Sequence, residues 1–251
     1  MIHHRRGLPD DWDAIAREHL GAWDDFSRDE QERLAGIADW LLHHKDWEAA
    51  HGFALDDAMR TTIAIEAAEL GLELDTGFYR EVGAIVVHPR TFVNRAPHAG
   101  PAGTVSEELV PVLGEAHDAR GAVLVAWDSV RDAARNPGRG RNVVFHEFAH
   151  KFDMLDGSLD GTPPLARKDL LARWVAACTD AYTALRQGRS RDPIDAYGGT
   201  NPAEFFAVAT ETFFDASIAL EREELAVYEV LRDFYRQDPA ERARRAVNPP
   251  R

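Results

Sequence analysis

The sequence predicts an α+β fold that is rich in helix, and three observations support this class. Apolar residues recur at helical spacing through most of the chain. Two short apolar segments, at residues 82–87 and 122–127, are typical of strands, and the first contains the β-branched run Ile85-Val86-Val87. Both segments precede residue 142, after which the sequence looks helical. Helices therefore outnumber strands, and the two kinds of element are segregated along the chain.

The expected elements follow from capping residues and periodicity. Ser27 and Glu30 form a capping-box pattern, and apolar residues at helical spacing follow them to Leu42. A second helix is predicted from about Asp56 to Gly71, and the proline- and glycine-containing residues 94–104 are predicted to be a loop. The remaining predicted helices are 142–155, 165–186, 201–215 and 220–236.

Length and composition predict one domain. The chain has 251 residues, of which 45% are hydrophobic, and this is ordinary for a globular protein with a sizeable core. We expect a single domain over residues 1–251, in which a helical N-terminal part, 1–80, packs on the rest. No run reaches the length of about 18 apolar residues that spans a bilayer.

Charge and cysteine usage restrict the partners and the compartment. The formal net charge is −14, so phosphate backbones and anionic lipid would be repelled, and neither nucleic acid nor a membrane is an expected partner. Residues 135–141 hold three arginines, but their proline and glycines indicate a solvated loop. Cys178 is the single cysteine and lies in an apolar helical stretch, which indicates a core residue. With no secretory signal at the N-terminus, a reducing, cytoplasmic location is expected.

The strongest motif is His146-Glu147-Phe148-Ala149-His150. Two histidines four residues apart on a helix lie one above the other, about 6 Å apart, and can bind one zinc ion together. Glu147 is rotated by about 100° from His146, so it can reach a water at the metal without being a ligand. That is the position of a general base in zinc-dependent hydrolysis. Asn142 is a good N-cap for this helix, and Asp153 is placed to accept a hydrogen bond from a metal-site histidine.

The third metal ligand is less clearly encoded. A metzincin would place a third histidine at position 156, which is an aspartate here, so that class is excluded. The remaining candidates are the carboxylates of Asp192, Asp195, Glu204 and Glu211. Glu204 also has a structural explanation, because Asn201, Pro202 and Glu204 form a capping-box arrangement in which the glutamate serves its own helix. Spacing alone therefore leaves these alternatives open.

Two segments resemble a known family. The stretch HEFAHKFDM, followed by DAYGGTNPAEFFAVATETFF, is similar to the Mlc titration factor A family of bacterial zinc peptidases, and the likeness extends upstream through IAIEAAELGLEL and VGAIVVHP. The resemblance implies a zincin-like, gluzincin catalytic domain, with zinc bound by His146, His150 and Glu204. It also places Tyr197 where a phenol could stabilise an oxyanion, and Glu211 beside a zinc-bound histidine.

The function expected from these residues is a cytoplasmic zinc metallopeptidase, and the resemblance implies aminopeptidase-like cleavage of short peptides. Glu147 would take the proton of the attacking water and pass it to the leaving amine, and Tyr197 would stabilise the oxyanion. The strand at 122–127 could pair with an extended substrate, by analogy with other zinc peptidases. Two alternatives remain: a regulatory protein that captures a transcriptional repressor, as the family name suggests, and a zinc hydrolase acting on small amides.

Overall fold

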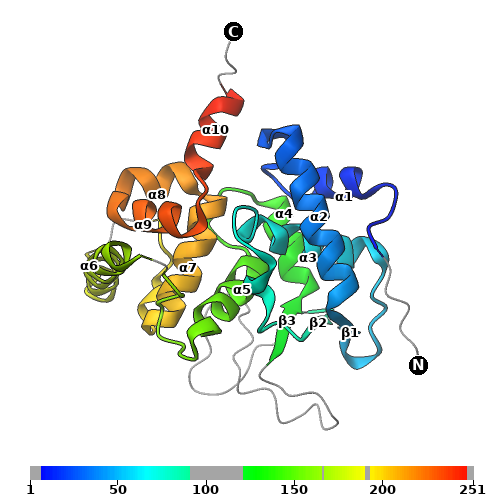
Figure 1. The fold of residues 1–251 in the computed structure, drawn as a ribbon, viewed down its shortest axis with the longest axis horizontal. Coiled ribbons are helices and arrows are strands. Elements are labelled where there is room, and N and C mark those ends of the chain that lie inside the picture. The colour runs from blue at the N-terminus through cyan, green and yellow to red at the C-terminus, as the bar shows by residue number, and fades with distance from the viewer. Residues whose placement is uncertain (1–6, 91–120, 166, 190–192, 248–251) are drawn as a thin grey trace.

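The chain's N-terminal half contains a three-stranded parallel sheet (Figure 1). The computed structural model describes residues 7–90, 121–165, 167–189 and 193–247. The strand order is β1–β2–β3, in which Ala84 pairs with Asp46 on one side and with Ala122 on the other. The strands are β1 (Asp46–Ala49), β2 (Ala84–His88) and β3 (Ala122–Ala126). The predicted loop 94–104 lies outside the described residues.

Helices make up most of the described chain, so the predicted helix-rich α+β class is confirmed. They are α1 (Trp12–His19), α2 (Arg28–His44), α3 (Asp57–Leu70), α4 (Trp127–Arg135), α5 (Val143–Asp153), α6 (Lys168–Arg186), α7 (Pro202–Asp215), α8 (Ser217–Glu223), α9 (Leu225–Tyr235) and α10 (Pro239–Val247). Of the described helices, none is long and apolar enough to cross a bilayer.

The local signals in the sequence place most helix ends correctly. The capping box at Ser27 and Glu30 forms, and Asp56 and Asn142 cap α3 and α5 as expected. Gly71 is the C-cap of α3. A side chain at this position would collide with the Tyr79 hydroxyl, because a Cβ atom on Gly71 would lie 2.2 Å from the hydroxyl oxygen. These helix boundaries are therefore fixed by short-range chemistry.

Two expectations about the elements are wrong, and one strand was not predicted. Trp127 does not end the second predicted strand but begins α4, with Asp128 in the favourable first turn. The predicted helix 220–236 is two helices, because Glu224 leaves the helical conformation between α8 and α9. The strand β1 was missed, since its four residues include no valine, isoleucine or threonine.

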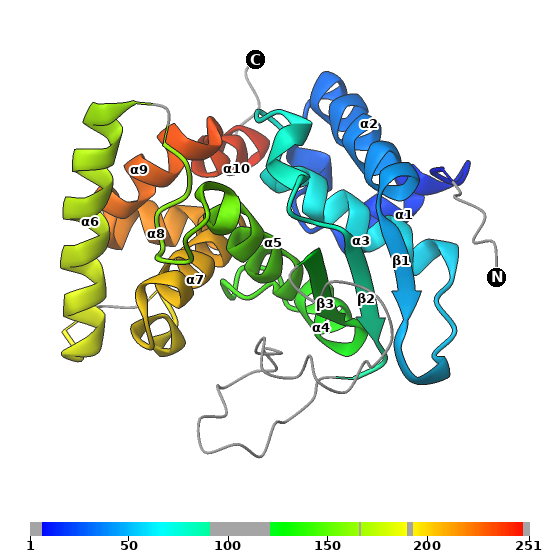
Figure 2. The same ribbon diagram turned by 60° about the horizontal axis from the view of Figure 1, so that its bottom comes forward.

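Within the described residues, one hydrophobic core joins the two halves of the molecule. The buried cluster runs from Ala16 in α1 to Ala240 in α10. Figure 2 shows α5 between the sheet on one side and the helices α6, α7, α8 and α9 on the other. α5 packs against both β3 and α7, so residues on α5 lie where the halves meet. Cys178 packs against this core, and burial raises the pKa of its thiol to about 12, as expected for a residue that is not a nucleophile.

Candidate metal centre

α5 brings the two motif histidines together. Asn142 begins this helix by accepting the backbone N–H groups of Val144 and Phe145, at 2.9 and 3.1 Å. The helix buries Val144 and Phe145, together with Phe148 and Phe152, in the core. His146 and His150 leave the helix one turn apart, and their Nε2 atoms lie 3.1 Å from each other. The predicted convergence of the two imidazoles is therefore present.

α7 adds a carboxylate to the same point. Glu204 Oε2 lies 3.1 Å from His146 Nε2 and 3.6 Å from His150 Nε2. Asn201 caps α7 by accepting the backbone N–H of Glu204 at 2.9 Å, so only one half of the expected capping box forms. The side chain of Glu204 points to the histidines and is not used by its own helix end.

The donor set fits a metal ion. Among the described residues, one group of at least three potential ligands has its atoms within 4.8 Å of one another, and it consists of His146, His150 and Glu204. Glu204 Oε2 is buried and has no hydrogen-bond partner. Three lone-pair donors that face one another at these distances repel unless a cation lies among them. Two imidazoles and one carboxylate also match the ligand set of many catalytic zinc sites.

Glu211 contacts Nδ1 of His146, the ring nitrogen that does not face Glu204. Its Oε1 lies 2.7 Å from His146 Nδ1, and its Oε2 accepts the backbone N–H of Asn142 at 2.6 Å. A carboxylate can only accept, so this partner assigns the proton to Nδ1 and leaves the Nε2 lone pair for a metal. The expectation for Glu211 is confirmed: it contacts the histidine and is not part of the three-residue group.

Electrostatics around the group follow from burial and proximity. Burial opposes the charged form of His146, but the nearby carboxylates of Glu204 and Glu211 raise the pKa of the imidazole well above its ordinary value. Burial also opposes ionisation of Glu204, yet the two histidines lower the pKa of this carboxyl group. Both shifts follow from the close approach of carboxylates and imidazoles within this group.

Glu147 lies beside the group without belonging to it. It is half-buried, and burial raises the pKa of its carboxyl group, while the neighbouring histidines lower it. A carboxyl group with a raised pKa is a better proton acceptor and donor near neutral pH. A raised pKa is what a general base requires, and this role for Glu147 stays a prediction.

Tyr197 is held near His146 by a separate turn. The turn is a short 3-10 helix (Ala196–Gly199), in which Asp195 accepts the backbone N–H of Tyr197 at 2.9 Å. Arg141, directly before α5, forms an ion pair with the same aspartate. The rings of Tyr197 and His146 have centroids 6.1 Å apart. Asp195 therefore positions this turn and does not join the three-residue group.

Two of the sequence expectations about acidic residues need comment. Asp192 lies outside the described residues, so its candidacy as a ligand stays untested. The expected bond from Asp153 to a metal-site histidine is not formed. Asp153 Oδ2 instead accepts the backbone N–H of Gly161 at 2.8 Å, and its Oδ1 has no hydrogen-bond partner. Burial raises the pKa of Asp153 to about 6.

Asp215 was missed by the sequence analysis. Its carboxylate accepts the backbone N–H groups of Gly138, Gly140 and Arg141, at 3.0, 2.6 and 3.4 Å. Asp215 thus fixes the loop that leads into α5, four residues beyond Glu211 on α7. The two glycines, which both adopt positive φ, were the available signal that this loop has a defined shape.

Comparisons with known proteins assign the chain to a family. The chain is 35% identical over 238 residues to the uncharacterized protein slr2042 of Synechocystis, which covers 94% of this chain and 86% of the relative. It is 33% identical over 236 residues to Mlc titration factor A of Yersinia pestis and of Yersinia pseudotuberculosis, covering 88% of this chain and 84% of each relative. A sequence model of the glucose-regulated metallo-peptidase M90 family matches residues 1–236, and the chain belongs to this family.

Proposed function

We propose that this protein is a zinc-dependent peptidase with an aminopeptidase-like preference for short peptides. The observation that carries the proposal is the convergence of His146, His150 and Glu204, with Glu147 beside them. A purely structural metal site needs a fourth protein ligand, whereas three ligands leave one position open for water or substrate. Among the described residues, no fourth His, Cys, Asp or Glu joins the group.

Each residue of the site has its own role in the proposed hydrolysis. A zinc ion bound here would polarise the substrate carbonyl and lower the pKa of a bound water to about 7. Glu147 accepts a proton from the attacking water and delivers it to the leaving amine. Tyr197 donates its phenolic hydrogen to the oxygen on which negative charge develops. Glu211 keeps the proton of His146 on Nδ1, so that Nε2 remains available as a ligand.

The substitution Glu147→Gln tests the assignment. Glutamine has the same shape but cannot accept a proton, so hydrolysis should fall by about 10²–10⁴-fold while zinc content is unchanged. The measurement combines metal analysis of the purified variant with digestion of a peptide library by both proteins, with and without a chelator. Release of N-terminal residues alone supports the aminopeptidase, and internal cuts support an endopeptidase. Unchanged hydrolysis in Glu147→Gln would remove this residue from the mechanism.

The substitution Tyr197→Phe tests the second catalytic role. Loss of one oxyanion donor should lower kcat by about 10²-fold, with little change in KM or in zinc content. Steady-state kinetics on the best library peptide give the two constants separately. A normal kcat would assign Tyr197 to packing against His146 alone.

A second candidate function comes from the relatives. The name Mlc titration factor A indicates that those proteins sequester Mlc, so this chain could bind a transcriptional repressor of its own host. The two functions separate at Glu147: repressor capture does not require a general base, so Glu147→Gln would bind as wild type does. If the zinc-loaded protein cleaves no peptide of the library, this result would favour the binding function.

A further inference from the structure

The loop between α4 and α5 has a defined shape, although several of its residues are exposed. Asp215 accepts three of its backbone N–H groups, those of Gly138, Gly140 and Arg141. Gly138 and Gly140 adopt φ angles of 81° and 68°, which glycine reaches without strain. Gly140 also lies against α7, because a Cβ atom on it would be 3.3 Å from the Thr212 hydroxyl oxygen. The backbone that carries Arg141 is therefore fixed to α7.

Arg141 extends from this loop to the turn that carries Tyr197, residues Ala196–Gly199. Its guanidinium forms an ion pair with Oδ2 of Asp195, and Oδ1 of the same carboxylate accepts the backbone N–H of Tyr197 at 2.9 Å. One carboxylate thus joins the loop before α5 to the Tyr197 turn. The side chain of Arg141 is 55% exposed and that of Asp195 is 24% exposed, so water and salt reach the pair. Such a pair contributes little to folding, and it can be removed without unfolding the chain.

Other bonds shape the turn internally. Thr200 Oγ1 donates to the carbonyl of Tyr197 at 2.7 Å. The N–H of Gly198 donates to the carbonyl of Asp195 at 3.0 Å. The ring of Tyr197 is tilted by 33° to that of His146, and their centroids are 6.1 Å apart. Because these bonds lie within the turn, a rotation of the whole turn would preserve them and would move the phenol relative to the metal-site histidine.

Three acidic residues of α7 act on three parts of the site. Glu204 belongs to the metal-binding group, Glu211 contacts the first histidine, and Asp215 holds the loop of Arg141. Intervals of seven and four residues place the three on one side of the helix. The helix that supplies the carboxylate of the metal group therefore also fixes the base from which Arg141 reaches the Tyr197 turn.

We propose that Arg141 is a positioning residue for Tyr197, and that its ion pair with Asp195 orients the Tyr197 turn so that the phenol faces the reacting carbonyl. The inference rests on the proposed peptidase function. Small displacements of a catalytic group lower the rate strongly, so an ion pair that is weak in terms of stability can still affect kcat. Tyr197 acts on charge that develops in the transition state, so the loss of the pair should lower kcat and leave KM nearly unchanged.

Steady-state kinetics on the best library peptide test this role. Arg141→Gln should lower kcat about fivefold and change KM less than about twofold. Asp195→Asn should have the same effect, because the asparagine oxygen still accepts the N–H of Tyr197 while the charge is lost. Asp195→Ala removes both interactions and should lower kcat further. In a Tyr197→Phe background, Arg141→Gln should have no additional effect on kcat.

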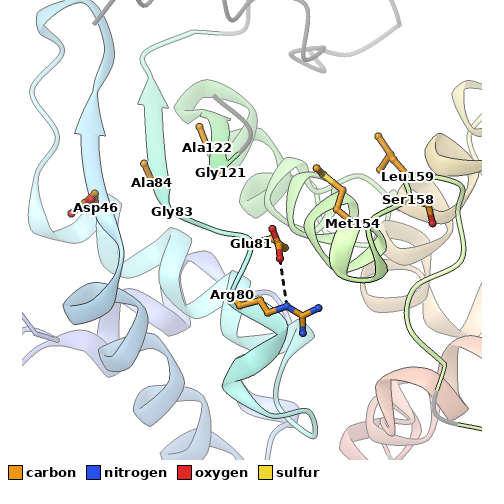
Figure 3. A pocket seen from close by; sticks show the side chains of 11 residues that line it. Asp46, Arg80, Glu81, Gly83, Ala84, Gly121, Ala122, Met154, Ser158 and Leu159 are labelled. Carbon is orange, nitrogen blue, oxygen red and sulfur yellow. Dashed lines mark ion pairs between the residues drawn. The ribbon is translucent and has the colours of Figure 1, made fainter. Parts of the chain in front are cut away.

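The matched control removes an exposed ion pair elsewhere. Glu81 pairs with Arg80 at 3.4 Å in a recess at the amino ends of the strands, none of whose lining residues belongs to the metal-binding group (Figure 3). The exposed fractions of the two side chains are similar to those of the proposed pair, 43% for Glu81 and 57% for Arg80. Glu81→Gln should therefore leave both kinetic constants unchanged.

Fluorine NMR follows the orientation of Tyr197 without hydrolysis. The zinc-loaded protein is prepared with 3-fluorotyrosine at its five tyrosine positions, and the signal of Tyr197 is the one missing from Tyr197→Phe. This signal should shift or broaden in Arg141→Gln, and in wild type at about 1 M NaCl, because salt screens an exposed ion pair. The remaining tyrosine signals should stay in place, and Glu81→Gln should change none.

The outcomes separate this inference from the peptidase assignment. A Tyr197 signal that is identical in wild type and Arg141→Gln overturns the positioning role, whatever the protein hydrolyses. A changed signal with an unchanged kcat also overturns it, and a raised KM with an unchanged kcat would assign Arg141 to substrate binding instead. If wild-type protein hydrolyses no peptide, the peptidase assignment fails, and a Tyr197 signal that responds to Arg141→Gln still supports the role of Arg141 in orienting the turn.

Discussion

Glutamates on two helices of this protein have pKa values that are shifted in opposite directions: Glu204 on α7, and Glu66 and Glu69 on α3. On α7, Glu204 lies against two imidazoles, and they lower its pKa despite partial burial. On α3, burial raises the pKa of Glu66 well above its ordinary value, although the Asn142 side chain bonds to it, and Glu66 Oε2 has no hydrogen-bond partner. Burial also raises the pKa of Glu69 to about 7, although Arg242 lies 3.5 Å away.

The hydrogen-bonding and charged partners of a buried carboxyl group, more than its depth of burial, decide whether it is ionised. On α7, Glu211 accepts two N–H groups, and Glu204 lies close to two histidine nitrogens. Those of α3 line a cavity of about 190 Å³ that they share with Asp215, and Arg242 is the arginine in its lining. Glu204 therefore lies with two histidines in a group that can hold a cation, whereas burial of Glu66 and Glu69 favours their protonated forms.

The largest effect should follow from Glu204→Ala. This substitution removes one of three ligands, so zinc affinity should fall by more than about 100-fold, since partners outside the ligand set alone contribute about 10–100-fold. Peptide hydrolysis should be lost with the metal. The helix should persist, because the cap at Asn201 uses the backbone N–H of residue 204. Zinc per chain after dialysis, with circular dichroism as a folding control, provides the measurement. Full zinc retention would show that another carboxylate completes the site.

A smaller effect is expected for Glu211→Gln. A glutamine can accept the proton of His146 Nδ1 or that of the Asn142 backbone, but its amide nitrogen cannot accept the other. Zinc affinity should therefore fall by about 10–100-fold, with the metal still bound at saturating zinc. Competition with a chromogenic chelator measures the change. Glu69→Gln, another buried glutamate outside the metal centre, is the matched control, and an equal loss in both variants would make the effect one of general stability.

Local chemistry explains which parts of the fold could be predicted. The caps at Ser27, Asp56 and Asn142 act over three or four residues, and the histidine pair of α5 needs only one helical turn. These features depend only on residues that are close together in the sequence. β1 and the break at Glu224 depend on pairing and packing with distant elements, so no pattern within a short window indicates them.

The metal centre shows the same limit. The contact between His146 and Glu204 spans 58 positions in the chain, and spacing alone left four carboxylates as candidates for the third ligand. The likeness to a known family singled out Glu204, and the geometry agrees. No resemblance or motif indicated the role of Asp215. Its three partners are backbone N–H groups of a loop, and every residue type except proline has such a group, so no sequence pattern identifies them.

The smallest effect concerns α3 and the pH dependence of stability. A carboxyl group whose pKa rises on folding binds its proton more tightly in the folded state, so it favours folding below its ordinary pKa of 4.5. For Glu69 this contribution is lost as the pH rises through about 7. The free energy of unfolding of wild type should therefore fall relative to Glu69→Gln between these values, by at most on the order of 3 kcal/mol. Urea titrations at pH 4.5, 6 and 8 measure the difference, with Glu32→Gln, an exposed position on α2, as control. Parallel curves for wild type and Glu69→Gln would mean that Arg242 keeps Glu69 ionised throughout, and the contrast between α3 and α7 would then rest on Glu66 alone.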